Sequence, residues 1–182
     1  MLPVLAAQHF SGGALVRGLG AGRTVSDILR DASPASPLLL LVRDRQVAAA
    51  GPTSLAWRSL EQLRAGAGWQ PAPGGGGDEA ALEAPGGGPP LPVYILGQES
   101  GGCVKLAVDV SALDPAAAEV AQGLQLQELR ALMPSLPAPE LAAAGHAVAL
   151  CQWHQARAGW GVLARNSAAC ACRLLHSPSA DG

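Results

Sequence analysis

The sequence of 182 residues contains few aromatic residues and few charges. Aromatic side chains make up 3% of it and charged side chains 14%, with a net charge of −2. A core therefore has to be built from leucine, valine and alanine. Lys105 is the only lysine, and the arginines do not cluster along the sequence. Because nucleic-acid binding needs a basic patch, no nucleic-acid partner is predicted.

Long apolar runs and cysteine-rich patterns are also missing. The longest apolar run, residues 37–42, is far shorter than the ~20 residues of a membrane-spanning helix, so no membrane partner is predicted. No secretory signal pattern is visible, and four cysteines are too few for a secreted disulfide scaffold. Free thiols in a reducing compartment are the expectation, which weakly favours the cytoplasm. Residues 1–26, with Arg17 and Arg23 and no acid, also fit an organelle transit peptide, so the localisation stays unknown.

Motifs that carry catalysis are absent as well. There is no Gly-x-Ser-x-Gly elbow, and neither glycine-rich stretch, 18–22 or 74–77, contains the Gly-Lys-Ser/Thr of a phosphate loop. The only local acidic group, Asp78 and Glu79 with Glu83, is interpreted as solubilising charge in a linker. The sequence therefore predicts no catalytic, cofactor-binding or metal-ligating residue.

Hairpin signals open the part of the chain that does have a pattern. Residues 38–42 (LLLLV) and 46–50 (QVAAA) flank the charged turn 43–45, which predicts two paired strands. Residues 54–57 are a candidate third strand, and Ser59 is a candidate N-cap for a short helix to Arg64. Residues 65–90 are rich in glycine and proline and are predicted to be a disordered insertion within one domain, with a domain boundary as the alternative.

The second half of the chain begins with strands and ends with helices. Residues 92–96 and 103–110 are predicted strands, and the second alternates apolar with polar residues. Helices are predicted over 116–121, 126–133 and 139–157. The last of them carries one apolar stripe: Leu141, Ala144, Val148 and Cys151. The predicted fold class is α+β, an antiparallel sheet with helices following.

Four short motifs share their order with one known family. They are Leu55-Ala-Trp57, Val93-Tyr-Ile-Leu-Gly97, Glu128-Leu-Arg-Ala-Leu-Met133 and the helix that ends Cys151-Gln-Trp-His154. Together they resemble the N-terminal domain of NADH pyrophosphatases, a branch of the Nudix hydrolases. The resemblance covers about residues 8–157 apart from the insertion, and Phe10 to Arg17 resembles the opening of that domain.

That resemblance carries expectations about function. In the family this domain precedes a zinc ribbon and a catalytic Nudix domain that uses Mg²⁺ or Mn²⁺, and it helps to pair two subunits. The parent activity is hydrolysis of NADH to a mononucleotide and AMP. By the resemblance, the expected partners are a second copy of the chain or a full-length homologue.

The sequence departs from the family after Arg157. The Nudix pattern G-x5-E-x7-R-E-U-x-E-E-x-G-U is absent, and so is any Cys-x-x-Cys pair. Cys170 and Cys172, with His176 and either His154 or Cys151, have the wrong spacing for a zinc knuckle, and residues 158–182 are predicted to be a disordered tail. Trp153 and His154 are interpreted as helix packing and a capping donor. Three hypotheses remain: a homologue reduced to its N-terminal domain and inactive alone, a non-catalytic dimerisation module, and a truncated gene product.

Overall fold

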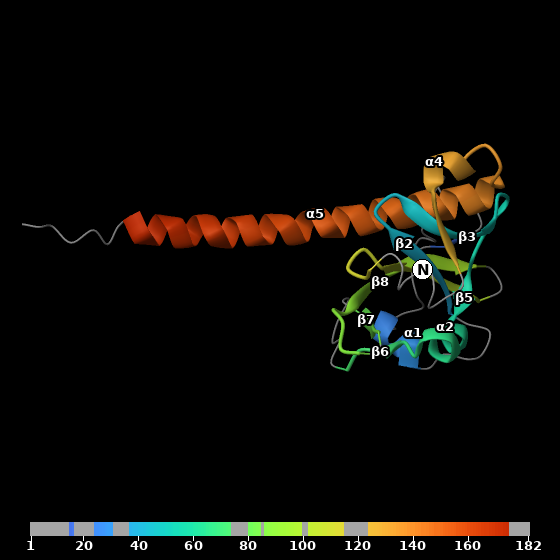
Figure 1. The fold of residues 1–182 in the computed structure, drawn as a ribbon, viewed down its shortest axis with the longest axis horizontal. Helices are drawn as coiled ribbons and strands as arrows, with labels where there is room; N and C mark the ends of the chain where they lie inside the picture. Colours follow the sequence, from blue (N-terminus) through green and yellow to red (C-terminus); the bar gives the residue numbers. More distant parts are fainter. Residues whose placement is uncertain are drawn as a thin grey trace, which may run out of the picture. The chain divides into compact units, whose positions relative to one another are not determined.

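A computed structural model of the chain describes residues 15–16, 24–30, 37–73, 80–84, 86–99, 102–114 and 124–174 (Figure 1). The chain divides into two units, residues 1–151 and residues 152–182. The first unit contains a sheet of ten strands among the described residues. The second contains the continuation of the last helix.

The sheet of the first unit is mixed, and its strands follow the order β10-β3-β2-β9-β8-β7-β6. β1 pairs with β8, β4 with β3, and β5 with β2. The strands are β1 (Leu15–Val16), β2 (Leu38–Arg43), β3 (Gln46–Gly51), β4 (Ser54–Leu55), β5 (Arg58–Ser59), β6 (Gln70–Pro71), β7 (Ala80–Glu83), β8 (Leu91–Glu99), β9 (Val104–Asp109) and β10 (Gln125–Glu128). The described helices are α1 (Val25–Arg30), α2 (Leu60–Ala67), α4 (Leu129–Leu132) and α5 (Ala138–Leu174).

The predicted hairpin is confirmed. β2 and β3 pair antiparallel through Val42 with Val47 and Arg43 with Gln46, which leaves Asp44 and Arg45 as the turn. Asp44 has a φ of 52°, a left-handed conformation that aspartate tolerates better than most residues. β2 is buried on both faces because it lies in the middle of the sheet.

The α+β class is confirmed, with two corrections to the predicted layout. β2 and β9 pair in parallel, from Leu38 with Lys105 to Val42 with Asp109, so the sheet is not purely antiparallel. A parallel pair needs a long crossover, and the chain between these strands supplies it with α2 and the six strands β3 to β8. Helices also do not all follow the strands, since α1 precedes β2 to β10 and α2 precedes β6 to β10.

Residues 65–90 were predicted to be a flexible insertion. Their described part includes the end of α2 and the strands β6 and β7. α2 starts at a capping box in which Ser59 is the predicted N-cap, and Gly68 closes the helix in the left-handed conformation with a φ of 67°. The next residue, Trp69, is 2% exposed, and Leu82 in β7 is fully buried. Within the described residues 65–73 and 80–84 these two side chains pack in the core, and the flexibility of the insertion as a whole stays a prediction. Residues 74–79 and 85 lie outside the described residues.

β8 and β9 form the predicted pair at the centre of the sheet. Leu106 and Val108 are buried as the alternating pattern predicts, but Ala107 and Asp109 are buried too. Lys105, on the same face as these two, contacts Trp57, whose indole binds Glu140 of α5. This face therefore lies under α5, which explains why the polar side of the strand is covered.

The predicted helix over residues 126–133 is half strand. β10 (Gln125–Glu128) pairs antiparallel with β3, and only the four residues of α4 are helical. The free edge of β3 supplies backbone partners, and such tertiary pairing overrides local helix propensity. The helix predicted over 116–121 lies outside the described residues.

α5 carries the predicted apolar stripe in the first unit. Ala144, Val148 and Cys151 are buried and Leu141 is partly buried against the core. In the second unit the helix continues to Leu174, so residues 158–174 are helical, and the disorder of residues 158–182 stays a prediction. Alanine and leucine are frequent there, and both favour helix. Residues 175–182 lie outside the described residues. Among the described helices, none combines the length and apolar character that crossing a bilayer requires.

Candidate functional site

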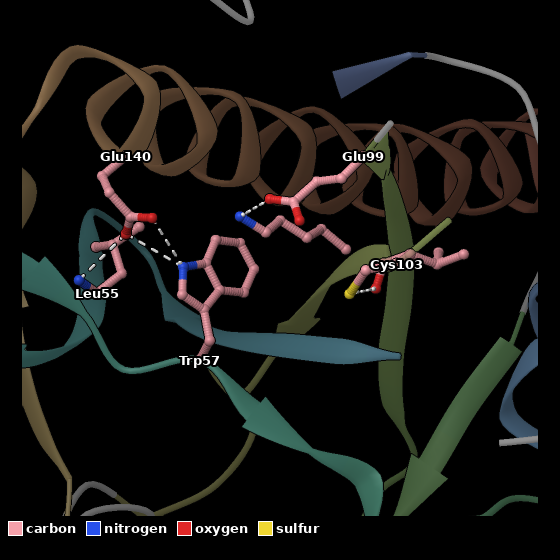
Figure 2. Close-up of polar contacts among 7 residues, drawn as sticks. Leu55, Trp57, Glu99, Cys103 and Glu140 are labelled. Carbon is pink, nitrogen blue, oxygen red and sulfur yellow. Dashed lines mark hydrogen bonds and ion pairs between the residues drawn. The ribbon is translucent and has the colours of Figure 1, made fainter. Parts of the chain in front are cut away.

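A carboxylate at the start of α5 connects that helix to the chain beside β4. Glu140 Oε2 accepts hydrogen bonds from the Leu55 backbone N–H at 3.3 Å and from the Trp57 indole Nε1–H at 3.1 Å. The indole also lies 3.3 Å from Glu140 Oε1. Figure 2 shows the Glu140 carboxylate pointing toward both donors. Burying an indole N–H without an acceptor is costly, so this contact explains how Trp57 is accommodated between sheet and helix.

The face of the Trp57 ring receives a cation. Lys105 Nζ lies 4.5 Å from the centre of the Trp57 ring and 2.7 Å from Glu99 Oε1. The Lys105 side chain is only 12% exposed, so its ion pair is screened less than a surface pair. Glu99 and Glu140 are drawn with Trp57 in Figure 2. Glu140, Trp57, Lys105 and Glu99 form one connected set, named here the Trp57 network.

The Trp57 network predicts a measurable loss of stability in the variant Glu140→Gln. A glutamine keeps one acceptor oxygen but loses the charge that strengthens the bonds to Leu55 and Trp57. We expect the free energy of unfolding to fall by about 1–2 kcal/mol. Urea denaturation measures this, with Glu128→Gln, an exposed glutamate, as the matched control. A double-mutant cycle with Trp57→Phe isolates the pair, and a coupling energy of zero would contradict the role of the indole bond.

The remaining carboxylates do not gather anywhere in the described part of the chain. Its glutamates lie on five different elements: Glu61 on α2, Glu83 on β7, Glu99 on β8, Glu128 on β10 and Glu140 on α5. No three His, Cys, Asp or Glu side chains of the described residues are placed to hold a metal ion. Hard Mg²⁺ or Mn²⁺ needs several carboxylate oxygens around one point, and these residues do not provide that donor set. Asp78 and Glu79 lie outside the described residues.

A second polar group lies between the sheet and its loops. Arg43 and Asp109, at the ends of β2 and β9, are 8% and 5% exposed. The Arg43 guanidinium donates to the Leu113 carbonyl, and Asp109 Oδ1 accepts from the Ser111 N–H at 3.0 Å. Both side chains thereby hold the loop that leaves β9, which is a structural role.

Cys151 lies on the buried face of α5. Burial and, as a smaller cause, the negative charge of Asp109 together raise the pKa of its thiol from 9.0 to about 12. A thiol kept protonated is a poor nucleophile and a poor metal ligand. Cys151 is therefore a core residue, and the structure does not support it as a zinc ligand.

Residues 36–153 match the model of one protein family, the NADH pyrophosphatase-like rudimentary NUDIX domain. The chain belongs to this family. The match confirms the resemblance drawn from the sequence motifs. No curated protein and no solved structure matches the chain.

The matched residues include the described strands β2 to β10 and the first turns of α5, while β1 lies outside the match. The motif Leu55-Ala-Trp57 lies in and after β4, and Val93 to Gly97 lies in β8. The motif residues Leu55 and Trp57 are the ones that bind Glu140. One of the family-like motifs thus has a structural explanation, since it positions the N-terminal end of α5.

The cysteines considered as a zinc knuckle remain without support. Cys170 and Cys172 lie in α5, and His176 lies outside the described residues. In the second unit Trp153 is 51% exposed, its ring meets the His154 ring edge to face at 4.7 Å, and Arg157 lies 4.6 Å from it. Trp153 therefore interacts with side chains of its own helix and is not a fully buried packing residue.

The Trp57 network was not predicted from the sequence, although one signal for it exists. Lys105 is the only lysine of the chain and lies on an apolar strand. A lone cation on such a strand needs a partner on the same face, and Glu99 and Trp57 are those partners.

Proposed function

We propose that these 182 residues form a non-catalytic rudimentary NUDIX domain that lacks a zinc ribbon and a Nudix box, and that its function is association. The partner is a second copy of the chain or a full-length homologue of the NADH pyrophosphatase type. The observation that supports the proposal is the position and bonding of the described glutamates, which are not grouped around one point. Glu140 and Glu99 serve the Trp57 network, and the other described glutamates lie on separate elements.

Hydrolysis of a pyrophosphate bond needs a metal-activated water and charge compensation on the phosphates. The Nudix pattern that would group the necessary glutamates on one helix is not in the sequence. A carboxylate already engaged by an indole N–H and a backbone N–H is a poor candidate to bind a metal instead. The family membership therefore concerns the fold of this chain, and the absence of the Nudix pattern from the sequence is evidence against pyrophosphate hydrolysis.

The edge of the sheet supports association. Among the described strands, β10 is the last of its path and pairs only with β3, so its outer side offers backbone donors and acceptors. Close to it in the chain, Met133 is 52% exposed. An antiparallel pairing of β10 with a second β10 would satisfy that edge with two-fold symmetry.

The purified chain is expected not to hydrolyse NADH with Mg²⁺ or Mn²⁺. The reason is that the described carboxylates cannot converge on one cation. Chromatographic detection of AMP after incubation with NADH measures this, with an active NADH pyrophosphatase as the positive control. Turnover on the order of 1 per second or faster would contradict the proposal.

Self-association is expected at micromolar concentration and is expected to depend on β10. Sedimentation velocity of the purified chain should show a dimer that becomes a monomer in the variant Gln125→Lys/Gln127→Lys, because adjacent like charges at a paired edge repel. Arg58→Lys, on β5 away from that edge, is the control. A monomer in the parent chain, or a dimer unchanged by the β10 variant, would remove the support for the association through this edge.

A further inference from the structure

A pocket of about 300 Å³ opens between the two small helices and the edge of the sheet. α1 packs against β6 and β7 at this end of the fold, as Figure 1 shows. The lining residues are Ser26, Leu29 and Arg30 of α1, Arg64 of α2, and Pro71, Ala72, Pro73, Ala80 and Ala81 of the strands and the chain beside them. Its volume is at the lower end for small-molecule sites, which suits a compact ligand.

The side chains that bring charge to this pocket are both arginines. Arg30 and Arg64 come from different helices, and no aspartate or glutamate is among the lining residues that the structure describes. Arg30 makes an ion pair with Asp27 at 3.5 Å, but both side chains are well exposed, and such pairs contribute little. Asp27 also accepts hydrogen bonds from Thr24 N and Oγ1, so its carboxylate is shared. In the part of the chain that the structure describes, Arg64 has no ion pair.

Two guanidinium groups that line one pocket favour the binding of an anion there. The described lining residues carry positive charge, although the whole chain has a net charge of −2. Each guanidinium can donate two parallel hydrogen bonds to a phosphate, a geometry that lysine cannot offer.

We propose that the pocket between Arg30 and Arg64 binds a small phosphate-bearing anion such as a phosphate monoester. The arginines bind the phosphate oxygens from two sides. The alanine and proline walls leave room for only a small organic group. The binding is separate from the association proposed above, because β10 lies at the opposite end of the strand order from β6.

Titration of the full chain with glycerol 2-phosphate tests this. We expect the backbone amide NMR signals of Ala72, Ala80 and Ala81 to shift and saturate at constant ionic strength. Arg64→Gln should weaken binding about tenfold or more, because it removes a charge-assisted bidentate contact. Arg64→Lys keeps the positive charge but loses the two parallel N–H donors of the guanidinium group, so it should give an intermediate affinity. Arg130→Gln, which removes the same charge from exposed α4, should leave the affinity within about twofold.

Three outcomes would overturn the proposal. The first is a shift that rises without saturating. The second is an equal loss of affinity in Arg64→Gln and Arg130→Gln, which would indicate attraction to overall charge only. The third is wild-type affinity in Arg64→Gln. Arg64 is exposed, so its variants should fold, and circular dichroism verifies this. Should Arg64→Gln fail to fold, Arg30→Gln, on the other side of the pocket, decides with the same expected loss.

Discussion

Replacing Trp69 by alanine is expected to lower the free energy of unfolding by about 3–5 kcal/mol. Trp69 is 2% exposed and is the largest of the fully buried side chains in the described core. Its removal deletes a large apolar surface and leaves a cavity that neighbouring β-strands can fill only in part. Small domains are stable by about 5–15 kcal/mol, so the variant would lose a large share of its stability. Urea denaturation followed by circular dichroism measures the change.

Trp153→Ala provides the matched control, because it makes the same chemical change at a side chain that is 51% exposed. We expect its effect to be below about 1 kcal/mol. The comparison also decides between two accounts of residues 65–90. A loss near zero for Trp69→Ala would return the segment around Trp69 to a flexible insertion and would remove β6 and β7 from the sheet.

Local features of this chain were predictable because each depends on neighbouring residues. The hairpin of β2 and β3 follows from two apolar runs around a charged turn. The helix α2 begins at Ser59 because a hydroxyl there can accept the N–H of Gln62, three residues on, at 3.2 Å. The buried stripe of α5 follows from helical spacing alone.

Long-range pairings were not predictable in the same way. The parallel pairing of Leu38 with Lys105 joins residues whose separation in the chain leaves no local sign of contact. β10 was predicted to be helical, since only the free edge of β3 makes Gln125–Glu128 a strand. Trp69 stands alone in a segment rich in glycine and proline, so composition pointed to disorder while one side chain supplied a core contact.

The contacts of the Trp57 network also could not be predicted from the sequence, because they join residues far apart in the chain. The hydrogen bond from Trp57 to Glu140 spans 83 residues of sequence. The family-like motif identified Trp57 as part of a recognisable segment, but not the carboxylate it binds. Predicting that pair needs the position of α5 over the sheet, which no local pattern contains.

Cys151 is expected to be strongly protected from thiol reagents in the folded protein. Its pKa of about 12 against an ordinary 9.0 means roughly a thousandfold less thiolate at neutral pH, and its side chain is fully buried as well. Cys103 is only partly buried and should react first. Alkylation with iodoacetamide followed by peptide-resolved mass spectrometry measures both sites, and urea-unfolded protein gives the unprotected rate. Labelling of Cys151 as fast as Cys103 in folded protein would contradict its place in the core.

The same thiol predicts how stability changes in alkaline solution. Folding raises the pKa of Cys151, so the folded state holds this proton more tightly than the unfolded state does. The contribution to stability is complete below pH 9 and is lost progressively as the pH rises from about 9 toward 12. Urea midpoints between pH 8 and pH 10.5 should therefore fall more steeply in the parent chain than in Cys151→Ala, where other titrating groups are unchanged. In Asp109→Asn the fall should start at the same pH, near 9, because the pKa of the unfolded thiol is unchanged. It should end at a lower pH, because the folded thiol then has a pKa raised by burial alone. The total loss of stability in Asp109→Asn is therefore smaller than in the parent chain. An identical pH profile of stability in the parent chain and in Cys151→Ala would show that the thiol is not the group responsible.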